Sequence, residues 1–320
     1  MNEFKYIFGP VRSGRLGLSL GLDLLGESIC SFDCLYCEVG RTTIKTVQRR
    51  PYVPAGEILS ELERWLSLGL PRPDCITLGG SGEPCLNSEL ETILRGVGEL
   101  APDIPRAVLT NSTLLGDPDV ARALNLAQTV LPSMDTLVEE EYRRLNRPDI
   151  SLSVREIAAS LLHWRTGYHG RVLLEILLVK GINDSEENLA LLRDFCSRLT
   201  PDRVDVVTLT RPGAYPPARA VDGHVLERWR RELGAMSPAS REKRDDIAPP
   251  ATTVDEAKAL AVILASLKRR PQTTDQLSSA LGIDTGVVET AVNELQENKS
   301  VVAVQSGDTT YFVFKCNEQH

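Results

Sequence analysis

The chain has 320 residues and a formal net charge of −8, with 42% hydrophobic and 25% charged residues, so its length and composition suit one large and one small globular domain. Without an apolar run near the ~20 residues that span a bilayer, or the apolar segment of a signal peptide, it is expected to be cytoplasmic with no membrane partner. The acidic charge disfavours broad, non-specific binding to nucleic acid.

The first predicted element is a strand over residues 16–24, LGLSLGLDL, where leucine occupies every second position. This period of two gives the strand one apolar face and one face of small or polar residues. A helix is predicted next, from Pro54 onward, because Ile58, Leu62 and Trp65 recur at helical spacing. The chain is thus predicted to begin with a strand, followed by a loop that contains cysteines and then by a helix.

Five further predicted strands follow, and each is succeeded by a helical pattern. They lie at residues 75–80, 106–111, 129–135, 171–179 and 203–210. Runs of Val, Ile and Leu are typical of strands covered on both faces, as in a parallel sheet, which right-handed crossovers curl into a barrel. Six strand–helix units are fewer than the eight of a closed barrel. The predicted fold class is therefore α/β, a partial (β/α)6 TIM-like barrel with its chemistry at the carboxyl ends of the strands.

This barrel is predicted to occupy residues 1–235, and a smaller unit to follow it. Residues 236–253 are rich in Pro, Ser, Ala and charge, which predicts a linker with few contacts across it. Residues 254–320 show three helical patterns and two alternating strands, and so resemble a winged-helix domain. From residue 251 onward, six Lys or Arg face nine Asp or Glu. A groove-reading domain is normally basic, so we interpret this unit as a protein-contact or substrate-capping module.

Three cysteines are concentrated in CSFDCLYC, as Cys30, Cys34 and Cys37. A four-iron cluster usually takes four thiolates, so three would leave one iron without a protein ligand. The alternatives are an incomplete zinc site, a disulfide or chance, but zinc usually needs a second Cys or His pair, which is absent. We predict a single cluster, because no cluster-like spacing occurs among the other cysteines, Cys75, Cys85, Cys196 and Cys316.

The spacing C-x3-C-x2-C, with Tyr36 before the last cysteine, resembles the motif of the radical S-adenosylmethionine (SAM) superfamily. The resemblance covers about residues 6–235 and includes the partial barrel. It implies that Cys30, Cys34 and Cys37 hold one [4Fe-4S] cluster and that SAM binds the open iron. It also implies reductive cleavage of SAM to a 5′-deoxyadenosyl radical that abstracts hydrogen from substrate, with an electron donor such as flavodoxin or ferredoxin.

The same resemblance implies a SAM site at the strand ends. GSGEP, residues 80–84, looks like the family's Gly-Gly-Glu-Pro element, whose backbone binds the methionine amino group. Polar residues at later strand ends would contact the methionine carboxylate, the ribose and the adenine. The residues implied in cofactor binding are Ser81, Gly82, Glu83, Asn111, Ser133, Asp135, Glu175 and Asn183.

Ordinary structural roles compete with these assignments. Ser133 and Asp135 are of the types that cap helices, and Asn183 is typical of turns. Glu175 interrupts the apolar run LLEILL, where a carboxylate needs a partner or a cavity. A structural ion pair of Glu175 with Arg171 or another barrel residue is the alternative to a cofactor contact.

Further segments, such as FGPVRSGRLGLSLGLDL and LVKGINDSEENL, resemble a branch related to the tRNA wyosine-base synthases. Those enzymes carry extra cysteines before the radical motif, whereas no cysteine precedes Cys30 here, so the match is to the branch alone.

Basic residues are expected in loops at or near the carboxyl ends of the strands. They are Arg12, Arg15, Arg41, Lys45, Arg49, Arg50, Arg147, Lys180 and Arg211. Such a concentration in an acidic chain suggests an anionic substrate, either an RNA phosphate backbone or a phosphorylated metabolite. Arg49 and Arg50 are the predicted substrate contacts, because a pair of guanidiniums can bind phosphate by bidentate hydrogen bonds.

Two hypotheses follow from the sequence. The first is a radical SAM enzyme that modifies an RNA base or an anionic small molecule. The second is a regulatory iron–sulfur protein in which the cluster is a sensor and the winged helix is the output. The cofactor-binding strand ends favour the enzyme, because a sensor has no need of them.

Overall fold

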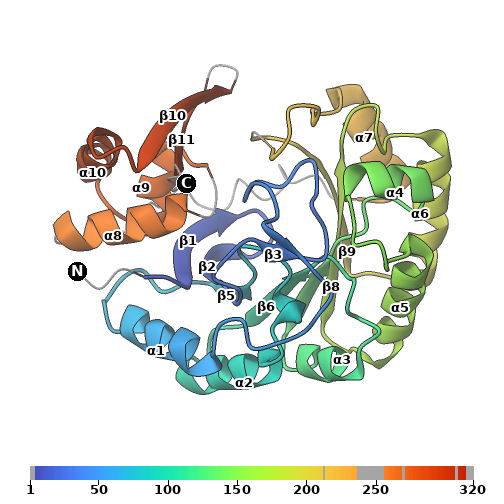
Figure 1. Cartoon of the computed structure of the whole chain (residues 1–320), viewed down its shortest axis with the longest axis horizontal. Coiled ribbons are helices and arrows are strands. Elements are labelled where there is room, and N and C mark those ends of the chain that lie inside the picture. Colours follow the sequence, from blue (N-terminus) through green and yellow to red (C-terminus); the bar gives the residue numbers. More distant parts are fainter. Residues whose placement is uncertain (1–3, 212, 236–255, 269–270, 307–308, 315–320) are drawn as a thin grey trace.

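The computed structural model describes residues 4–211, 213–235, 256–268, 271–306 and 309–314. A seven-stranded sheet forms its centre, in the order β1-β2-β5-β6-β7-β8-β9 (Figure 1). The strands are β1 Ile7–Ser13, β2 Gly17–Leu22, β5 Cys75–Leu78, β6 Arg106–Thr110, β7 Thr129–Pro132, β8 Arg171–Leu178 and β9 Arg203–Thr208. From β2 to β9 all neighbours are parallel, and β1 pairs antiparallel with β2 at the edge.

The outer face of the curled sheet is covered by helices (Figure 1). They are α1 Ala55–Leu66, α2 Leu90–Leu100, α3 Pro118–Leu124, α4 Glu139–Leu145, α5 Val154–Gly167, α6 Glu186–Leu199 and α7 Gly223–Glu232. The predicted partial barrel of six strand–helix units is thus confirmed. The edge strand β1 was not predicted. Its sequence contains Gly9 and Pro10, which usually interrupt a strand, and its pairing with β2 is irregular between Phe8 and Val11.

The alternation predicted for the first strand is present in β2. Leu20 and Leu22 are fully buried in the main core under the helices, whereas Ser19 shares a hydrogen bond with Thr77 of β5. Gly21 lies on the same face as Ser19, and a Cβ there would come 2.1 Å from the Phe8 ring. The inner side of the sheet is therefore lined by small and polar groups on the β2–β5 side. Beside these groups, a small apolar cluster runs from β5 to β8 and consists of Leu16, Cys75, Ala107, Leu109, Leu131 and Leu173.

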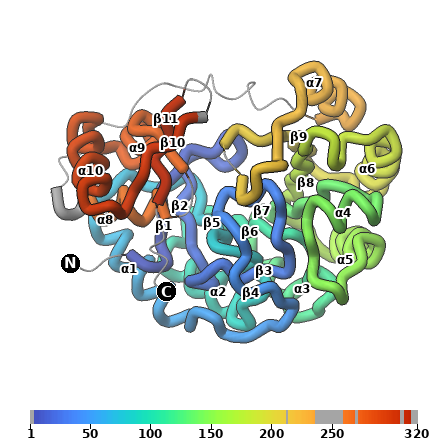
Figure 2. Tube along the Cα trace, turned by 45° about the horizontal axis from the view of Figure 1, so that its top comes forward, coloured from blue at the N-terminus to red at the C-terminus, as the bar shows by residue number. Residues whose placement is uncertain are grey.

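The C-terminal part contains the three predicted helices and the predicted β-hairpin. These are α8 Glu256–Leu267, α9 Thr274–Leu281, α10 Thr285–Glu297, β10 Val301–Ser306 and β11 Thr309–Phe314. Helices α8 and α9 pack against β1, and Arg12 of β1 donates to Ser279 Oγ at 2.7 Å (Figure 2). The C-terminal part thus covers the edge of the sheet, which is more contact than the linker composition predicts. The predicted linker itself, 236–253, lies outside the described residues.

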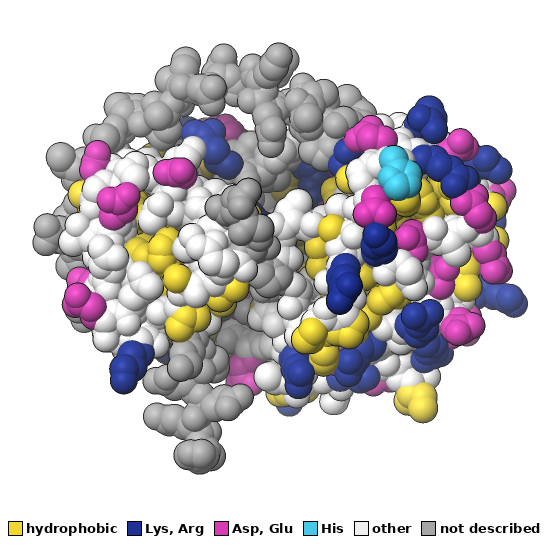
Figure 3. Space-filling view, turned by 90° about the horizontal axis from the view of Figure 1, so that it is seen from above, with side chains coloured by type: hydrophobic (Ala, Val, Ile, Leu, Met, Phe, Trp, Pro, Cys, Tyr) yellow, Lys and Arg dark blue, Asp and Glu magenta, His cyan; other side chains and the backbone are white. Residues whose placement is uncertain are grey.

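The charges of the two parts differ on the face shown in Figure 3. Basic and acidic side chains are interspersed over the α4–α7 side, whereas acidic side chains outnumber basic ones on the visible C-terminal part. This pattern agrees with the sequence count that opposed a groove-reading domain. Within the described ranges, no helix is long and apolar enough to cross a membrane.

Candidate active site

The three clustered cysteines lie on the loop between β2 and α1. This loop contains a pair of two-residue strands, β3 Ile29–Cys30 and β4 Ile44–Lys45, which run parallel and place Lys45 beside Cys30. Backbone hydrogen bonds fasten the loop to the end of α4, from Asp33 N to Asn146 O at 3.0 Å and from Leu35 N to Leu145 O at 2.9 Å. The end of α4, more than 100 residues away in sequence, therefore fixes the position of the cysteine loop.

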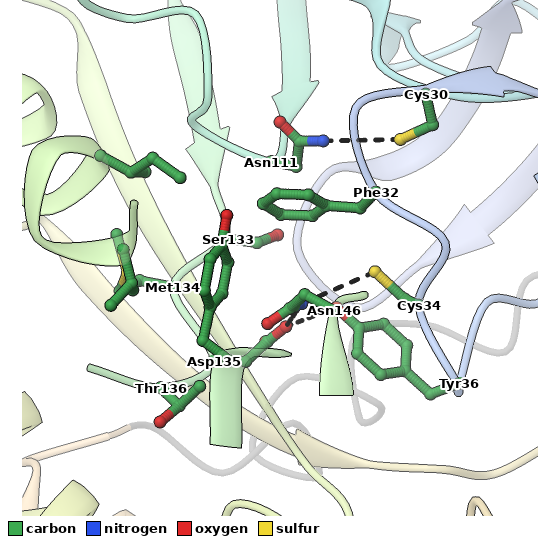
Figure 4. A pocket seen from close by; sticks show the side chains of 13 residues that line it. Cys30, Phe32, Cys34, Tyr36, Asn111, Ser133, Met134, Asp135, Thr136 and Asn146 are labelled. Atoms are coloured by element: carbon green, nitrogen blue, oxygen red, sulfur yellow. Dashed lines mark hydrogen bonds between the residues drawn. The ribbon is translucent and has the colours of Figure 1, made fainter. Parts of the chain in front are cut away.

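Each cysteine sulfur of this loop faces an N–H donor. Asn111 Nδ2 lies 3.5 Å from Cys30 Sγ, and Asn146 Nδ2 lies 3.6 Å from Cys34 Sγ (Figure 4). Cys37 Sγ is hydrogen-bonded by backbone N–H groups that follow it in the loop. Burial raises the pKa of all three thiols, that of Cys30 to about 12. A buried thiolate thus requires compensating charge, and N–H donors of this kind also stabilise the sulfurs that ligate a cluster.

Cys30 and Cys34 open onto a cavity with one apolar and one polar wall (Figure 4). The apolar wall comes from the loop and from α4 and α5, with Phe32 and Tyr142 in edge-to-face contact at 5.6 Å. The remaining lining residues are Tyr36, Asn111, Ser133, Met134, Asp135, Thr136, Asn146, Val154 and Ile157. The cavity therefore joins two of the three sulfurs to the carboxyl ends of β6 and β7.

Asp135, just after β7, fastens the cysteine loop to the sheet. Its Oδ2 accepts hydrogen bonds from Tyr36 Oη at 2.5 Å and Asn146 Nδ2 at 2.9 Å, and its Oδ1 accepts from Leu177 N at 2.9 Å. Burial raises the pKa of Asp135 to about 6, although these hydrogen bonds oppose the shift. Asp135 does not cap α4, whose N-cap residue is Val138.

The GSGEP segment follows β5 and lies directly against the cysteine loop. A Cβ at Gly82 would come 1.7 Å from the Ile29 carbonyl oxygen, so only glycine fits there. Ser81 Oγ donates to the buried Asp23 at 2.7 Å. The buried Glu83 side chain accepts from Thr110 Oγ1 at 2.8 Å, Asn111 N at 2.6 Å and Cys85 N at 3.0 Å. The side chains of Ser81 and Glu83 are therefore engaged within the protein, and the backbone of the segment adjoins Cys30.

The other predicted cofactor residues differ in how far they are engaged. Ser133 lines the cavity, and its hydroxyl has no hydrogen-bond partner among the described residues. Asn183 is fully buried and holds the turn after β8, through bonds to Asp135 O at 2.9 Å, Leu177 O at 2.8 Å and Val179 N at 2.7 Å. Of these two, Ser133 is the side chain that remains available to a ligand.

Glu175 forms the ion pair that the sequence left as one alternative, although its partner is not Arg171. Arg15, in the turn between β1 and β2, reaches across the inside of the barrel to Glu175 on β8. On β9, Arg203 pairs with Asp205, and both side chains are almost fully buried. This side of the barrel interior is thus charged, in contrast to the β2–β5 side.

The basic residues expected near the strand ends do not form one group. Arg12 and Arg15 belong to β1 and to the turn before β2, so their expected location at the carboxyl ends of parallel strands is wrong. Arg49 pairs with Asp117 at 3.1 Å and donates to the Cys85 carbonyl oxygen, while the exposed Arg50 lies over the Tyr52 ring. The two predicted substrate-binding guanidiniums therefore engage separate partners.

The chemistry of the donor set fits an iron–sulfur cluster with one open position. Among the described residues, no group of three His, Cys, Asp or Glu is placed to hold a single metal ion. Cys75, Cys85 and Cys196 are free and lie away from the loop motif, with Cys85 Sγ donating to Thr110 Oγ1. Cys316 lies outside the described residues. The three loop thiols are thus the candidate ligands for a cluster.

Sequence reasoning missed Asn146, whose amide contacts both Cys34 Sγ and Asp135. Its context, RRLNRPD, indicates only the end of a helix, and Asn146 does occupy the C-cap of α4. Phe32 lies between Cys30 and Cys34 in the motif itself. An aromatic residue at that position could have been predicted to form part of the cavity wall. Tyr142 carried no comparable signal, because an aromatic on a helix is ordinarily part of the core.

Comparisons with known proteins agree with this arrangement. The model of the Radical SAM superfamily matches residues 28–192. A UPF0026 protein of Synechocystis sp. is 33% identical over 221 residues, which cover 69% of this chain and 80% of that protein. A UPF0026 protein of Helicobacter pylori is 30% identical over 223 residues, 69% of this chain and 71% of that protein.

Two further matches are informative in different ways. A protein named GTPase Obg from Brachyspira hyodysenteriae is 29% identical over 303 residues, which cover 93% of this chain but only 43% of that protein. The crystal structure of a radical SAM methyltransferase from Sphaerobacter thermophilus superposes with a TM-score of 0.53 at 20% identity, over 68% of this chain and 63% of that one. The second likeness concerns the fold alone.

Proposed function

Because this chain belongs to the radical SAM superfamily and is a homologue of the UPF0026 proteins, we propose that it cleaves SAM reductively and abstracts hydrogen from an anionic substrate. One [4Fe-4S] cluster would be held by Cys30, Cys34 and Cys37. The observation that carries the proposal is the cavity, which brings the sulfurs of Cys30 and Cys34 to the carboxyl ends of β6 and β7.

When bound, the cluster supplies the electron that cleaves the sulfonium of SAM. This chain's own residues would bind, orient and shield the cofactor. The backbone of residues 80–84, held against the cysteine loop at Gly82, would bind the methionine end. The Ser133 hydroxyl, which has no hydrogen-bond partner in the described part of the chain, would contact a polar group of SAM. Phe32 and Tyr142 would exclude water from the reacting end of the cavity.

Other predicted residues would act through their neighbours. Asn111 and Asn146 would hold the sulfurs of Cys30 and Cys34 by their amide groups. Asp135 would position the loop through Tyr36, while Asn183 would shape the turn near the adenine. A single cluster is proposed because the remaining described cysteines show no common site.

The substrate is proposed to be an RNA base or a phosphorylated metabolite. The resemblance to the branch of wyosine-base synthases favours RNA. Arg50, exposed over Tyr52, remains a proposed substrate contact, and Arg49 would join it only by leaving Asp117. The C-terminal part is proposed to be a winged-helix-like module, from residue 254 onward, that contacts a protein or caps the substrate. A flavodoxin or ferredoxin would supply electrons.

Anaerobic incubation of the reconstituted protein with SAM and dithionite tests the proposal. We expect release of 5′-deoxyadenosine by the wild type and none by Cys34→Ala. A protein that binds its cluster but releases no 5′-deoxyadenosine would contradict the enzyme and support an iron–sulfur sensor with the C-terminal part as output.

A further inference from the structure

The segments that follow α4 and β9 meet the cysteine loop beyond Cys37 and form a basic surface with it. Its members are Arg41, Lys45, Arg147 and Tyr215, which we call the basic rim. The guanidinium carbons of Arg41 and Arg147 lie 4.7 and 4.3 Å from the centre of the Tyr215 ring. Cation–π contacts of this kind hold guanidiniums in place without neutralising their charge.

Tyr215 anchors the basic rim to the cysteine loop. Its hydroxyl donates to Asp33 Oδ2 at 2.6 Å, and its backbone N–H donates to the Leu35 carbonyl at 3.1 Å. Asp33 and Leu35 flank Cys34 in the sequence. The rim is therefore fixed relative to the proposed cluster ligands rather than carried on an independent loop.

The positive charge of the basic rim is only partly compensated. Arg147 pairs with Asp33 at 3.1 Å, but Arg41 and Lys45 form no ion pair with a described residue. The Lys45 ammonium donates instead to the carbonyl oxygens of residues 147 and 148. Asp149 is within electrostatic reach of Lys45, but it accepts its hydrogen bonds from Ser151. Arg49, Lys180 and Arg211, by contrast, are each paired with a carboxylate.

The basic rim is open to solvent and adjoins the cavity. Arg41 and Lys45 are exposed, and the Arg147 side chain is 41% exposed. Arg147 directly follows Asn146, which lines the cavity. The backbone of Arg147 has a φ of +47°, a value that non-glycine residues rarely adopt. The basic rim is therefore joined through Arg147 to a residue that lines the cavity, although no rim residue lines the cavity itself.

We propose that the basic rim binds a phosphate of the substrate and so places the reacting group over the cavity, an inference that rests on the proposed function. Guanidiniums present paired N–H donors that match phosphate oxygens, and Lys45 adds a point charge. The open position suits the phosphodiester of an RNA strand, because a small metabolite is usually enclosed. The predicted pair Arg49 and Arg50 would then be secondary to Arg41 and Lys45.

Binding of two probes to the full chain, a labelled single-stranded RNA 12-mer and GMP, tests this inference as a function of salt. We compare the wild type with Arg41→Gln, with Arg41→Gln/Lys45→Gln and with the control Arg95→Gln/Arg122→Gln. The control also removes two positive charges. Its two arginines are exposed, lie on α2 and α3, and both pair with Glu91. These measurements need no SAM cleavage, so their failure is distinguishable from failure of the proposed function.

We expect Arg41→Gln/Lys45→Gln to lower RNA affinity at least about tenfold at low salt and to reduce the slope of log K against log salt by about 1.4, since each single-strand contact contributes about 0.7. Arg41→Gln alone should give about half of that reduction in slope. Selective loss of GMP binding instead would support the rim as a site for a phosphate monoester. The inference is overturned if the wild type binds neither probe, if the rim variants bind as the wild type does, or if the control loses as much affinity.

Discussion

Glu83 and Asp135 are both buried carboxylates just beyond the carboxyl ends of strands, yet they hold different parts of the molecule. Glu83 accepts hydrogen bonds from Thr110 and from the backbone of residues 85 and 111, all at the β5–β6 end of the sheet. Asp135 accepts one from Tyr36 of the cysteine loop and another from Asn146, which also contacts Cys34. The same residue class thus holds neighbouring strand ends together at one position and ties the cysteine loop to the sheet through a side-chain hydroxyl at the other.

The largest expected effect is on iron binding, and it distinguishes the cysteine near Asp135 from the cysteine near Glu83. Cys34 adjoins the Asp135 network, whereas the buried Cys85 follows Glu83 and donates to Thr110. Cys34→Ala, like Cys30→Ala and Cys37→Ala, should abolish binding of a competent cluster, because a ligand is lost. Cys85→Ala should retain full iron content after anaerobic reconstitution. Equal iron content in the Cys34 and Cys85 variants would show that Cys34 is not a cluster ligand.

Glu83→Ala should destabilise the fold most among the carboxylate variants. It leaves three buried donors without an acceptor, each at a cost of about 1–3 kcal/mol, so we expect the free energy of unfolding to fall by about 3–5 kcal/mol. Urea denaturation measures this loss. The control is Glu141→Ala, which removes hydrogen bonds from the side chains of Thr136 and Ser185 but none from the backbone, and should cost about 1–2 kcal/mol. Equal losses in both variants would refute the assigned role of Glu83.

Tyr36→Phe should have a smaller effect on stability but a specific one on the cluster. It removes only the hydroxyl that joins the cysteine loop to Asp135, at a cost of about 1–3 kcal/mol. Iron loss to a chelator should become several-fold faster. Tyr168→Phe removes a buried hydroxyl bonded to the Ala127 carbonyl and should leave the rate of iron loss unchanged. Identical rates in the two variants would argue that Asp135 does not position the loop.

Arg49→Gln should produce the smallest effect. Its ion pair with Asp117 is partly exposed, so the expected loss of stability is about 0–1 kcal/mol. RNA affinity should not change measurably, because the charge of Arg49 is already compensated. A marked loss of RNA affinity would instead restore Arg49 as a substrate contact.

The sequence was sufficient for the fold because most elements carry local signals. The alternation in β2 and the apolar runs of the later strands each follow from burial on one or both faces. β1 was missed because Gly9 and Pro10 interrupt its pattern, and an edge strand tolerates such residues when neighbouring helices, here α8 and α9, cover it.

The site was predictable only where its residues form a contiguous motif. Cys30, Cys34 and Cys37 could be read from spacing, and Gly82 from its resemblance to a family element. The contact of Arg15 with Glu175 joins residues 160 positions apart, and the contact of Asn146 with Cys34 joins residues 112 apart. No local pattern records such pairs, and counts of arginines do not show which ones already have a carboxylate partner.

We propose that three cysteines hold one four-iron cluster and leave one iron open to SAM. The decisive experiment is electron paramagnetic resonance of the reduced protein, recorded before and after addition of SAM and combined with an iron determination. We expect about four irons per chain and a spectrum that changes when SAM is added. Eight irons per chain would rule out a single cluster, and a spectrum that SAM leaves unchanged would rule out an iron open to SAM.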